Sequence, residues 1–344
     1  MASNGKSICV VGASGLVGSN IVRVALERGY SVNGTLRDRK APDKAPYLEA
    51  LPGAAHGLNL FDADMADEHS LDAPVAGTDG VFIACLIPTY VGASGKPARE
   101  MDDEQGYAEI IMPTVNGCLN IMRSAIRAGI KDIVIGSSTS STNPVPAVPV
   151  KNEVDHWSDE AEQAAAKKYT SATKTVMEKA AIALAEAHGV RLRIMLPTLM
   201  LGPMVLPRHG DEGFMLTIKQ MLRGQATRHE RAPNDSTSMA HIDDVAHLFL
   251  AAYESPTAEG RYYAVRESWH WNDIYTALGE IEPSMRLPEL YEGEPAAPTG
   301  FDFTRRDSLG VKMRAIPEIL SAAVDYAKGQ IGSSAAKSSP PAGP

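Results

Sequence analysis

The feature that most constrains the fold is an apolar run that passes through three glycines into an amphipathic segment. Residues 8–11 read as a buried strand, Gly12, Gly15 and Gly18 follow at intervals of three, and residues 19–28 have helical spacing before Gly29. Glycine has no Cβ, so the backbone can turn sharply, approach a pyrophosphate and let the helix pack closely on the sheet. The stretch predicts a strand, turn and helix that bind a dinucleotide. An ordinary strand–helix turn without a ligand is the alternative.

Composition narrows the class of protein. The 344 residues are enough for one large unit or two subdomains, and the fractions of hydrophobic and charged residues are those of a globular protein. The net charge of −9 argues against binding to nucleic acid or to an anionic membrane. We expect no membrane span and no signal peptide. The cysteines, Cys9, Cys85 and Cys118, show no paired spacing, which favours a reducing compartment and a cytoplasmic location.

Strand and helix patterns alternate as far as residue 196. Further strands are expected at residues 31–36, 56–60, 80–85, 131–135 and 191–196, with long helices at 109–128 and 159–188. This alternation predicts an α/β fold of the Rossmann type, a doubly wound parallel sheet.

The alternation ends near residue 202. A helix over 214–223, a strand at 239–242, a helix over 245–254 capped by Asp243 and Asp244, and a strand at 261–265 are expected to form a small α+β substrate lobe. We place the dinucleotide-binding domain at residues 1–200. The lobe covers 201–331, with some return to the core, and a disordered tail covers 332–344.

Charges after the second strand bear on the choice of dinucleotide. In this fold an acidic residue there binds the ribose 2′-hydroxyl, whereas an arginine accommodates a 2′-phosphate. Arg37 comes first, and Lys44 is one of three further cations nearby, although Asp38 follows at once. The pattern favours NADP(H), with a solvated basic loop as the alternative. Asp64, after the third strand, is expected either to accept a hydrogen bond from adenine or to cap a helix.

Hydroxyl side chains follow the fifth strand. Residues 137–142 are all serine or threonine, and at the carboxyl edge of a parallel sheet they can polarise a substrate carbonyl. A plain Ser/Thr-rich loop is the alternative. The long loop over residues 86–106 is expected to border the substrate.

Together these pieces resemble the extended short-chain dehydrogenase/reductase superfamily, in the branch of dihydroflavonol reductase and cinnamoyl-CoA reductase. The resemblance covers roughly residues 5–270 and rests on residues 12–18, 35–38, 63–67, 137–138, 174–175 with Glu178, 197–198 with 202–203, and 241–245. It implies cofactor contacts at Gly12, Ser14, Gly15, Leu16, Val17, Gly18, Arg37, Lys44, Asp64, Met65, Ala84, Lys174, Pro197 and Thr198.

The resemblance also implies a catalytic serine, tyrosine and lysine, with the tyrosine four residues before the lysine. On a helix these two share a face, so the ammonium lowers the pKa of the phenol, which gives its proton to the developing alkoxide. Ser138 and Lys174 match, but Thr170 stands four residues before Lys174 and Tyr169 five before it. We predict Tyr169 as the proton donor, brought into place by a one-residue π-bulge.

Two other interpretations of the displaced tyrosine stay open. In one, Thr170 serves only as a weak hydrogen-bonding group, and another group or water supplies the proton; in the other, the protein is not an ordinary ketone reductase. Tyr90 and Tyr107 are substitute donors with weaker support.

The predicted function is therefore an NADP(H)-dependent oxidoreductase that reduces a carbonyl or C=C bond of a small, largely apolar molecule. The alternatives are a redox-neutral epimerase, isomerase or dehydratase on the same fold, and a non-catalytic NADP(H)-binding protein. No metal is expected, since the histidines lack ligand spacing and His241 and His247 read as structural. The resemblance adds a homodimer as one option.

Overall fold

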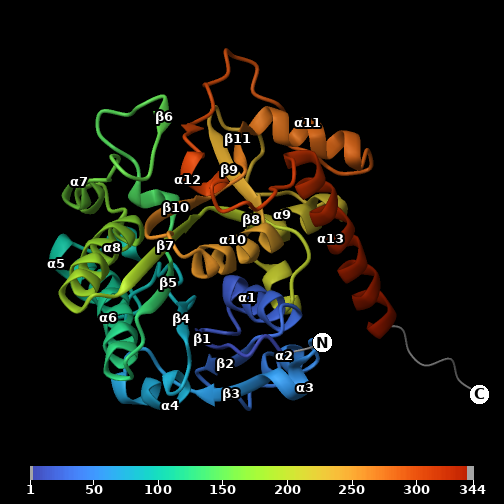
Figure 1. The fold of residues 1–344 in the computed structure, drawn as a ribbon. Coiled ribbons are helices and arrows are strands. Elements are labelled where there is room, and N and C mark those ends of the chain that lie inside the picture. Colours follow the sequence, from blue (N-terminus) through green and yellow to red (C-terminus); the bar gives the residue numbers. More distant parts are fainter. Residues whose placement is uncertain (1–2, 339–344) are drawn as a thin grey trace, which may run out of the picture.

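A parallel sheet of seven strands forms the centre of the molecule (Figure 1). The computed structural model describes residues 3–338. The strand order is β10-β7-β5-β4-β1-β2-β3, and every neighbouring pair is parallel. The strands are β1 (Ser7–Val11), β2 (Ser31–Leu36), β3 (Leu58–Asp62), β4 (Gly80–Ile83), β5 (Asp132–Gly136), β7 (Arg191–Pro197) and β10 (Gly260–Ala264).

Helices cover both faces of this sheet, as a doubly wound fold requires. One apolar core lies under α6 (Met112–Arg127) and α8 (Tyr169–His188), and the other under α1 (Leu16–Glu27) and α10 (Ile242–Glu254). The inner strands β1, β4 and β5 are buried between the two helical layers, which explains why they appear as short continuous apolar runs. The shorter helices are α2 (Ala45–Glu49), α3 (Ala54–Gly57), α4 (Asp72–Val75), α5 (Asp103–Gly106), α7 (Glu160–Ala165) and α12 (Thr304–Asp307), with a π-helical turn at Tyr107–Ile111.

A small lobe with its own apolar core stands over the carboxyl ends of the central strands. Its sheet has the order β11-β9-β8, made of β8 (Leu199–Leu201), β9 (Ser236–His241) and β11 (Glu267–His270). Helices α9 (Gly213–Leu222), α11 (Trp271–Ile281) and α13 (Ile316–Ser338) pack around it (Figure 1). A separate two-stranded sheet joins β6 (Val150–Lys151) to β12 (Gly300–Phe301).

Two elements that we expected in the lobe belong to the central layer instead. Strand β10 pairs in parallel with β7 and ends the large sheet, and α10 packs on the face that α1 covers. Both are apolar enough to be buried, so their sequences suit either position. The cap of α10 also differs from the prediction: His241 accepts a hydrogen bond from the Asp243 N–H at 3.2 Å.

The helix expected over residues 159–188 is broken into α7 and α8. Residues 166–168 leave the helical path, and Lys167 has a φ of +56°, which ends α7 in a left-handed residue. The tail expected from residue 332 is also different, because α13 continues to Ser338. Residues 339–344 lie outside the described part of the chain.

The sheet reverses its winding direction between β1 and β4. From β1 the chain moves outward to β2 and β3, and then returns to the other side of β1 to build β4, β5, β7 and β10. Open parallel sheets bind ligands at such a switch point, beyond the carboxyl ends of the strands. Within residues 3–338, no helix combines the length and the hydropathy that crossing a membrane requires.

Candidate active site

A cavity of about 980 Å³ opens at this switch point. Its walls come from the glycine turn after β1, the ends of β2, β4, β5 and β7, the first turns of α8, and the lobe segments η5 (Pro207–Asp211) and α9. The predicted site residues that line it are Gly12, Ser14, Gly15, Leu16, Val17, Arg37, Lys44, Asp64, Met65, Ala84, Ser138, Lys174, Pro197 and Thr198. Gly18 and Tyr169 do not.

The glycine turn is built by close backbone packing. Gly12 has a φ of +87°, and a Cβ there would lie 2.7 Å from the Cβ of Cys85. A Cβ on Gly18 would overlap the carbonyl oxygen of Gly12. Gly18 therefore contributes by letting α1 lie against the turn rather than by lining the cavity. Gly15 is the N-cap of α1 and offers no side chain, so nothing covers the N–H groups of the first turn.

The end of β2 presents cations to the cavity. Arg37 and Lys44 line it, whereas the carboxylate of Asp38 accepts a hydrogen bond from the Lys40 N–H at 2.9 Å within its own exposed loop. Asp64 and Asp67 divide the two roles that we left open for the loop after β3. Asp67 caps the following 3₁₀ turn by accepting from the His69 N–H, and Asp64 lines the cavity.

Ser138 lies just beyond the carboxyl end of β5, where it lines the cavity. Its backbone is extended, and its hydroxyl oxygen accepts a hydrogen bond from the Ser140 N–H at 3.2 Å. The hydroxyl hydrogen thus stays available for another acceptor. The neighbouring Ser137 donates to the buried carboxylate of Glu178 on α8, so the strand end is fixed to the helix that carries Lys174.

Lys174 and Thr170 hold the loop after β4 from the same face of α8. The Lys174 ammonium donates to the carbonyl of Leu86, and the Thr170 hydroxyl donates to the carbonyl of Thr89 at 2.7 Å. Lys174 is buried, and desolvation lowers its pKa to about 8, while the nearby Glu178 acts in the opposite direction.

Tyr169 occupies a different environment from the one that we predicted. It is fully buried, and its hydroxyl donates to Asp103 at 2.7 Å and accepts from Lys167 at 3.0 Å. Its ring packs against Gly106, where a Cβ would lie 2.5 Å from the ring. Helix α8 is α-helical throughout, so the expected π-bulge is absent from it, and the extra residue turns Tyr169 about 100° away from the cavity. The prediction of Tyr169 as the proton donor is corrected by this placement.

Of the two substitute tyrosines, Tyr90 lines the cavity and Tyr107 does not. Tyr90 is 67% exposed, so it lies at the rim. Sequence reasoning missed three other residues: Arg208 and His209 in the wall, and Arg261, which pairs with Glu178 at 2.8 Å. All three depend on contacts between distant segments, and no local motif marks them.

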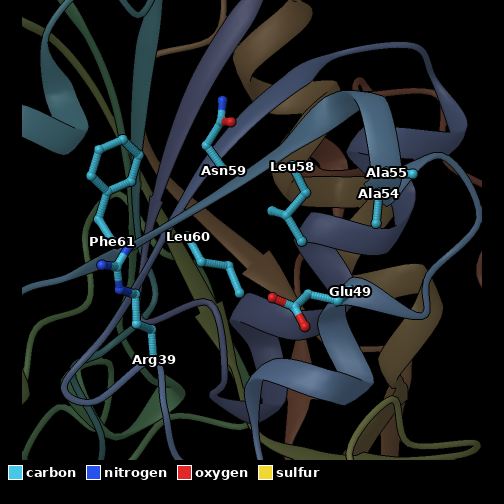
Figure 2. Close-up of a pocket in the computed structure, with 8 residues that line it drawn as sticks. All are labelled: Arg39, Glu49, Ala54, Ala55, Leu58, Asn59, Leu60 and Phe61. Carbon is cyan, nitrogen blue, oxygen red and sulfur yellow. The ribbon is translucent and has the colours of Figure 1, made fainter.

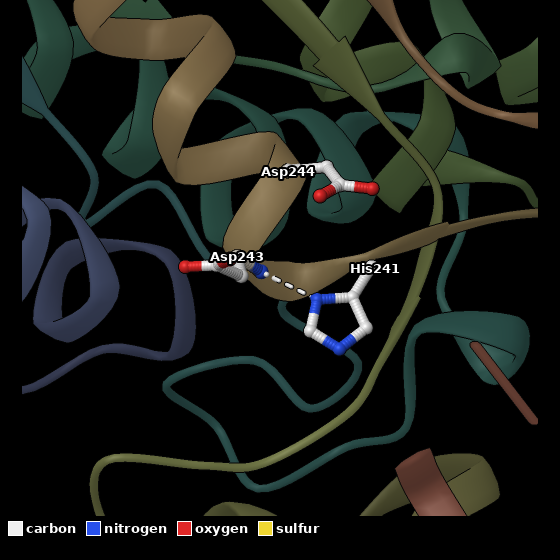
Figure 3. Close-up of side chains that lie close together, drawn as sticks. All are labelled: His241, Asp243 and Asp244. Atoms are coloured by element: carbon white, nitrogen blue, oxygen red, sulfur yellow. Dashed lines mark hydrogen bonds between the residues drawn. The ribbon is translucent and has the colours of Figure 1, made fainter. Parts of the chain in front are cut away.

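His241, Asp243 and Asp244 lie close together at the start of α10 (Figure 3). Their ligand atoms are within 4.8 Å of one another, a spacing that a metal ion could use. Two arginines already neutralise them: Arg23 pairs with Asp243, and Arg314 pairs with both aspartates. The cluster therefore ties the start of α10 to α1 and to the segment before α13, and we assign no metal to it.

A second hollow of about 540 Å³ lies beside the edge strand β3 (Figure 2). It is lined by Arg39, Glu49, Ala54, Ala55, Leu58, Asn59, Leu60 and Phe61, none of which lines the larger cavity. Arg39 there pairs with Asp62 at 3.2 Å. None of the glycine turn, Ser138 and Lys174 lines this hollow, so the larger cavity is the candidate site.

Comparisons with known proteins identify the family of the chain. The model of the NAD dependent epimerase/dehydratase family matches residues 8–265. Cinnamoyl-CoA reductase CAD2 of Medicago truncatula is 31% identical over 289 residues, 83% of each chain. A bifunctional dihydroflavonol 4-reductase/flavanone 4-reductase of Malus domestica is 30% identical over 341 residues, 96% of this chain and 93% of that protein.

Solved structures with the same fold include two reductases. Vestitone reductase from alfalfa has a TM-score of 0.73 at 23% identity and covers 94% of this chain and 98% of its own. The yeast methylglyoxal/isovaleraldehyde reductase Gre2, complexed with NADPH, has a TM-score of 0.76 at 18% identity, covering 95% and 99%. At these identities the two structures support the fold alone.

Proposed function

Since the chain belongs to the NAD dependent epimerase/dehydratase family, we propose that it is an NADP(H)-dependent reductase of the extended short-chain type. Its substrate in this proposal is a small, largely apolar molecule with a carbonyl group. One observation carries the proposal: a single cavity joins the glycine turn, the cations after β2, and the pair Ser138 and Lys174. Relatives named as cinnamoyl-CoA reductase and dihydroflavonol 4-reductase support the same assignment.

The cavity suits NADP(H) on the chemistry of its walls. Gly12 and Gly15 make a turn so tight that a Cβ would lie 2.7 Å from Cys85 and 3.2 Å from the Gly12 carbonyl oxygen, respectively, and the start of α1 lines the same cavity. Arg37 and Lys44 would bind the 2′-phosphate, because Asp38 is engaged in its own loop. Lys174 would hold the nicotinamide ribose, as the family resemblance implies. The bound cofactor supplies the hydride.

Ser138 would bind the substrate oxygen. Its hydroxyl oxygen already accepts from Ser140, which leaves the hydrogen to be donated to the carbonyl. This hydrogen bond strengthens as negative charge develops on that oxygen. The hydrogen bond between Ser137 and Glu178 fixes the end of β5 as this charge develops.

The proton for the product alcohol is best supplied by Lys174. No phenol stands on its face of α8, since Thr170 takes that position and Tyr169 is turned away. A serine or threonine hydroxyl is a far weaker acid than an ammonium group with a lowered pKa. One of the three ammonium hydrogens goes to Leu86, and the other two are free for the ribose and the substrate oxygen.

Part of the remaining wall of the cavity is apolar and fits the proposed substrate class. Leu86, Ile87 and Pro88 come from the loop after β4, and Met200, Met204, Phe214 and Met215 from the lobe. Methionines adapt to ligands of different shape, and Ile87 is 61% exposed at the rim. We expect an aromatic or branched apolar group to lie here.

A redox-neutral reaction is the second candidate, and the threonine at position 170 favours it. A tightly bound dinucleotide would then be regenerated in each turnover. The two candidates differ in the mass of the product, because reduction adds two hydrogens and isomerisation adds none.

The test follows the absorbance of NADPH with a panel of aldehydes, ketones, CoA thioesters and enones, with products identified by mass spectrometry. We expect NADPH oxidation with at least one apolar carbonyl compound. Binding of NADPH without oxidation by any compound would contradict the reductase assignment.

The cytoplasmic location and the homodimer stay predictions; the free state of Cys9, Cys85 and Cys118 supports the location.

A further inference from the structure

Arg208 is a cation of the cavity that the proposed function has not used. Among the described residues, the arginines and lysines that line the cavity are Arg37, Lys44, Lys174 and Arg208. The first two belong to the 2′-phosphate end and Lys174 to the nicotinamide end. Arg208 comes from the lobe, yet its Nη2 donates to the carbonyl oxygen of Ser14 at 2.7 Å. It therefore stands directly at the glycine turn.

The Arg208 guanidinium is incompletely satisfied there. Its Nε is buried and has no hydrogen-bond partner. A buried donor without a partner destabilises the fold, more so when it belongs to a charged group, so such atoms call for an explanation. An anionic ligand in the cavity would supply the missing acceptor.

The adjacent His209 provides a second, independent sign of a missing polar ligand. Its side chain lines the same cavity, the residue is only 7% exposed, and Nδ1 is buried without a partner. Desolvation, followed by the charge of Arg208, lowers the pKa of His209 to about 4, so the ring is neutral near pH 7. Two buried nitrogens on consecutive residues of the cavity wall thus lack a hydrogen-bond partner.

The segment that carries both residues is held firmly in place. Gln330 of α13 donates to the carbonyl of Pro207 at 3.2 Å, and Lys219 of α9 pairs with Asp211 at 2.6 Å. A Cβ on Gly210 would lie 3.0 Å from the ring of Tyr326, so the segment packs tightly on α13. Arg208 is therefore presented by a supported wall.

We propose that Arg208, with His209 beside it, forms the second wall of a pyrophosphate site whose first wall is the glycine turn and the start of α1. The helix offers N–H groups and the positive end of its dipole, but within the described residues its first turn carries no cation of its own. The guanidinium would add a full charge and a planar pair of donors, Nε and Nη2, that match two phosphate oxygens. His209 would find a partner for Nδ1 in a polar group of the same ligand.

This inference rests on the proposed function for the identity of the dinucleotide, and the arginine at the opposite end supplies a matched control. Arg208→Gln and Arg37→Gln are titrated, beside the unaltered protein, with NADPH, NADH and 2′-AMP, by quenching of intrinsic fluorescence or by calorimetry. NADPH contains both phosphate sites, NADH only the pyrophosphate, and 2′-AMP only the 2′-phosphate. Circular dichroism and thermal unfolding confirm that each variant is folded.

The two variants should show opposite patterns. Arg208→Gln should weaken NADPH and NADH by a similar factor, about tenfold or more for a lost charge-assisted hydrogen bond, and leave 2′-AMP unchanged. Arg37→Gln should weaken NADPH and 2′-AMP and leave NADH unchanged. Arg208→Lys should recover part of the affinity, since it restores the charge without the planar fork.

Three results would overturn the inference in distinguishable ways. If the unaltered protein binds neither dinucleotide, the proposed function fails and this inference with it. If it binds NADPH and Arg208→Gln binds equally well, the inference alone fails. If Arg208→Gln weakens 2′-AMP as much as NADPH, Arg208 acts through the whole fold or at the 2′-phosphate, and the pyrophosphate assignment is wrong.

Discussion

Thr170 stands on the face of α8 where the family resemblance places a phenol, so in the proposed reaction its identity bears on how a proton reaches the substrate. We predict that Thr170→Tyr raises kcat for NADPH-dependent reduction. A phenol four residues before Lys174 would share its face and act as a general acid, an effect worth about 10²-fold or more where geometry is good. Thr170→Phe is the control, since it loses the bond to Thr89 and adds the same ring without the hydroxyl. Equal rates for these two variants would show that a phenol is not what the site lacks.

Lys174 gives the reaction a predicted pH dependence. Burial lowers its pKa to about 8, so the ammonium is the main form below that pH and the neutral amine above it. If the ammonium donates the proton, kcat for reduction should fall as pH rises through about 8 and level off at low pH. Stopped-flow rates of NADPH oxidation across this range measure the effect. In Thr170→Tyr the descending limb should move, because a second acid then takes part; an unchanged limb would speak against Lys174 as the donor.

The contact between α8 and the central sheet depends on a buried ion pair. Arg261 on β10 donates to Glu178 at 2.8 Å, to the carbonyl of Glu153 and to Ser141, and its guanidinium stacks on Trp157 at 3.6 Å from the ring centre. Burial raises the pKa of Glu178, and Arg261 and the serine hydroxyls oppose this shift. The pair thus fixes the hydroxyl-rich end of β5 beside Lys174.

Replacing only one partner of the Arg261–Glu178 ion pair should destabilise the protein more than replacing both. Arg261→Met leaves the Glu178 carboxylate buried and unpaired, which we expect to lower the free energy of unfolding by about 3–5 kcal/mol. The double variant Arg261→Met/Glu178→Met should lose less than the sum of the single changes, with a coupling energy of about 0.5–3 kcal/mol. Urea unfolding of the four proteins measures this cycle. Strict additivity would mean that the two residues act independently.

The elements differ in how well their own residues specify them. Strand β1 is an apolar run that ends at Gly12, and β2 and β7 each follow soon after a glycine that ends a helix, so the sequence predicts all three almost to the residue. Local pattern does not reveal that β10 joins the large sheet, because its partner β7 lies over sixty residues away. The break at Lys167 is also invisible, since residues 160–188 keep helical composition across it.

The residues of the candidate site also differ in how well the sequence predicts their positions. Residues in local motifs, such as Gly12, Arg37 and Lys174, were predicted, and the structure brings them to one cavity. Tyr169 was misplaced because a shift of one residue on a helix changes its direction completely. Arg208 was missed because its position depends on how the lobe packs over the glycine turn, which no short stretch of sequence encodes.

At the scale of the whole molecule, the central sheet and the lobe meet at one cavity. The sheet supplies the glycine turn, Ser138 and Lys174, and the lobe supplies the apolar wall and Arg208. Helix α13 supports the lobe side through Tyr326, which donates to the carbonyl of Met204 at 3.4 Å. Substrate range should therefore change with the lobe residues, while cofactor affinity depends on both halves.

Two buried histidines should make the stability of the whole molecule depend on pH. Desolvation lowers the pKa of His209 and of His241 to about 4, helped by the charges of Arg208 and Arg314. The unfolded chain, with histidine pKa near 6.5, therefore binds more protons than the folded protein between about pH 4 and 6.5. The free energy of unfolding should therefore fall by at least about 2 kcal/mol as the pH falls through this window. Below about pH 4 these two histidines should change it little further.

Substitution isolates this contribution from that of the carboxyl groups. Asp244, whose pKa is raised by burial, contributes a slope of the opposite sign, so the difference between variant and unaltered protein is the informative quantity. His209→Gln and His241→Asn, the second of which keeps a capping oxygen for α10, should each flatten the curve of unfolding free energy against pH. His69→Gln is the control, because the side chain of His69 is 85% exposed, and it should leave the slope unchanged. Parallel curves for all four proteins, measured by urea unfolding from pH 7 downward, would show that neither buried ring is held neutral by the fold.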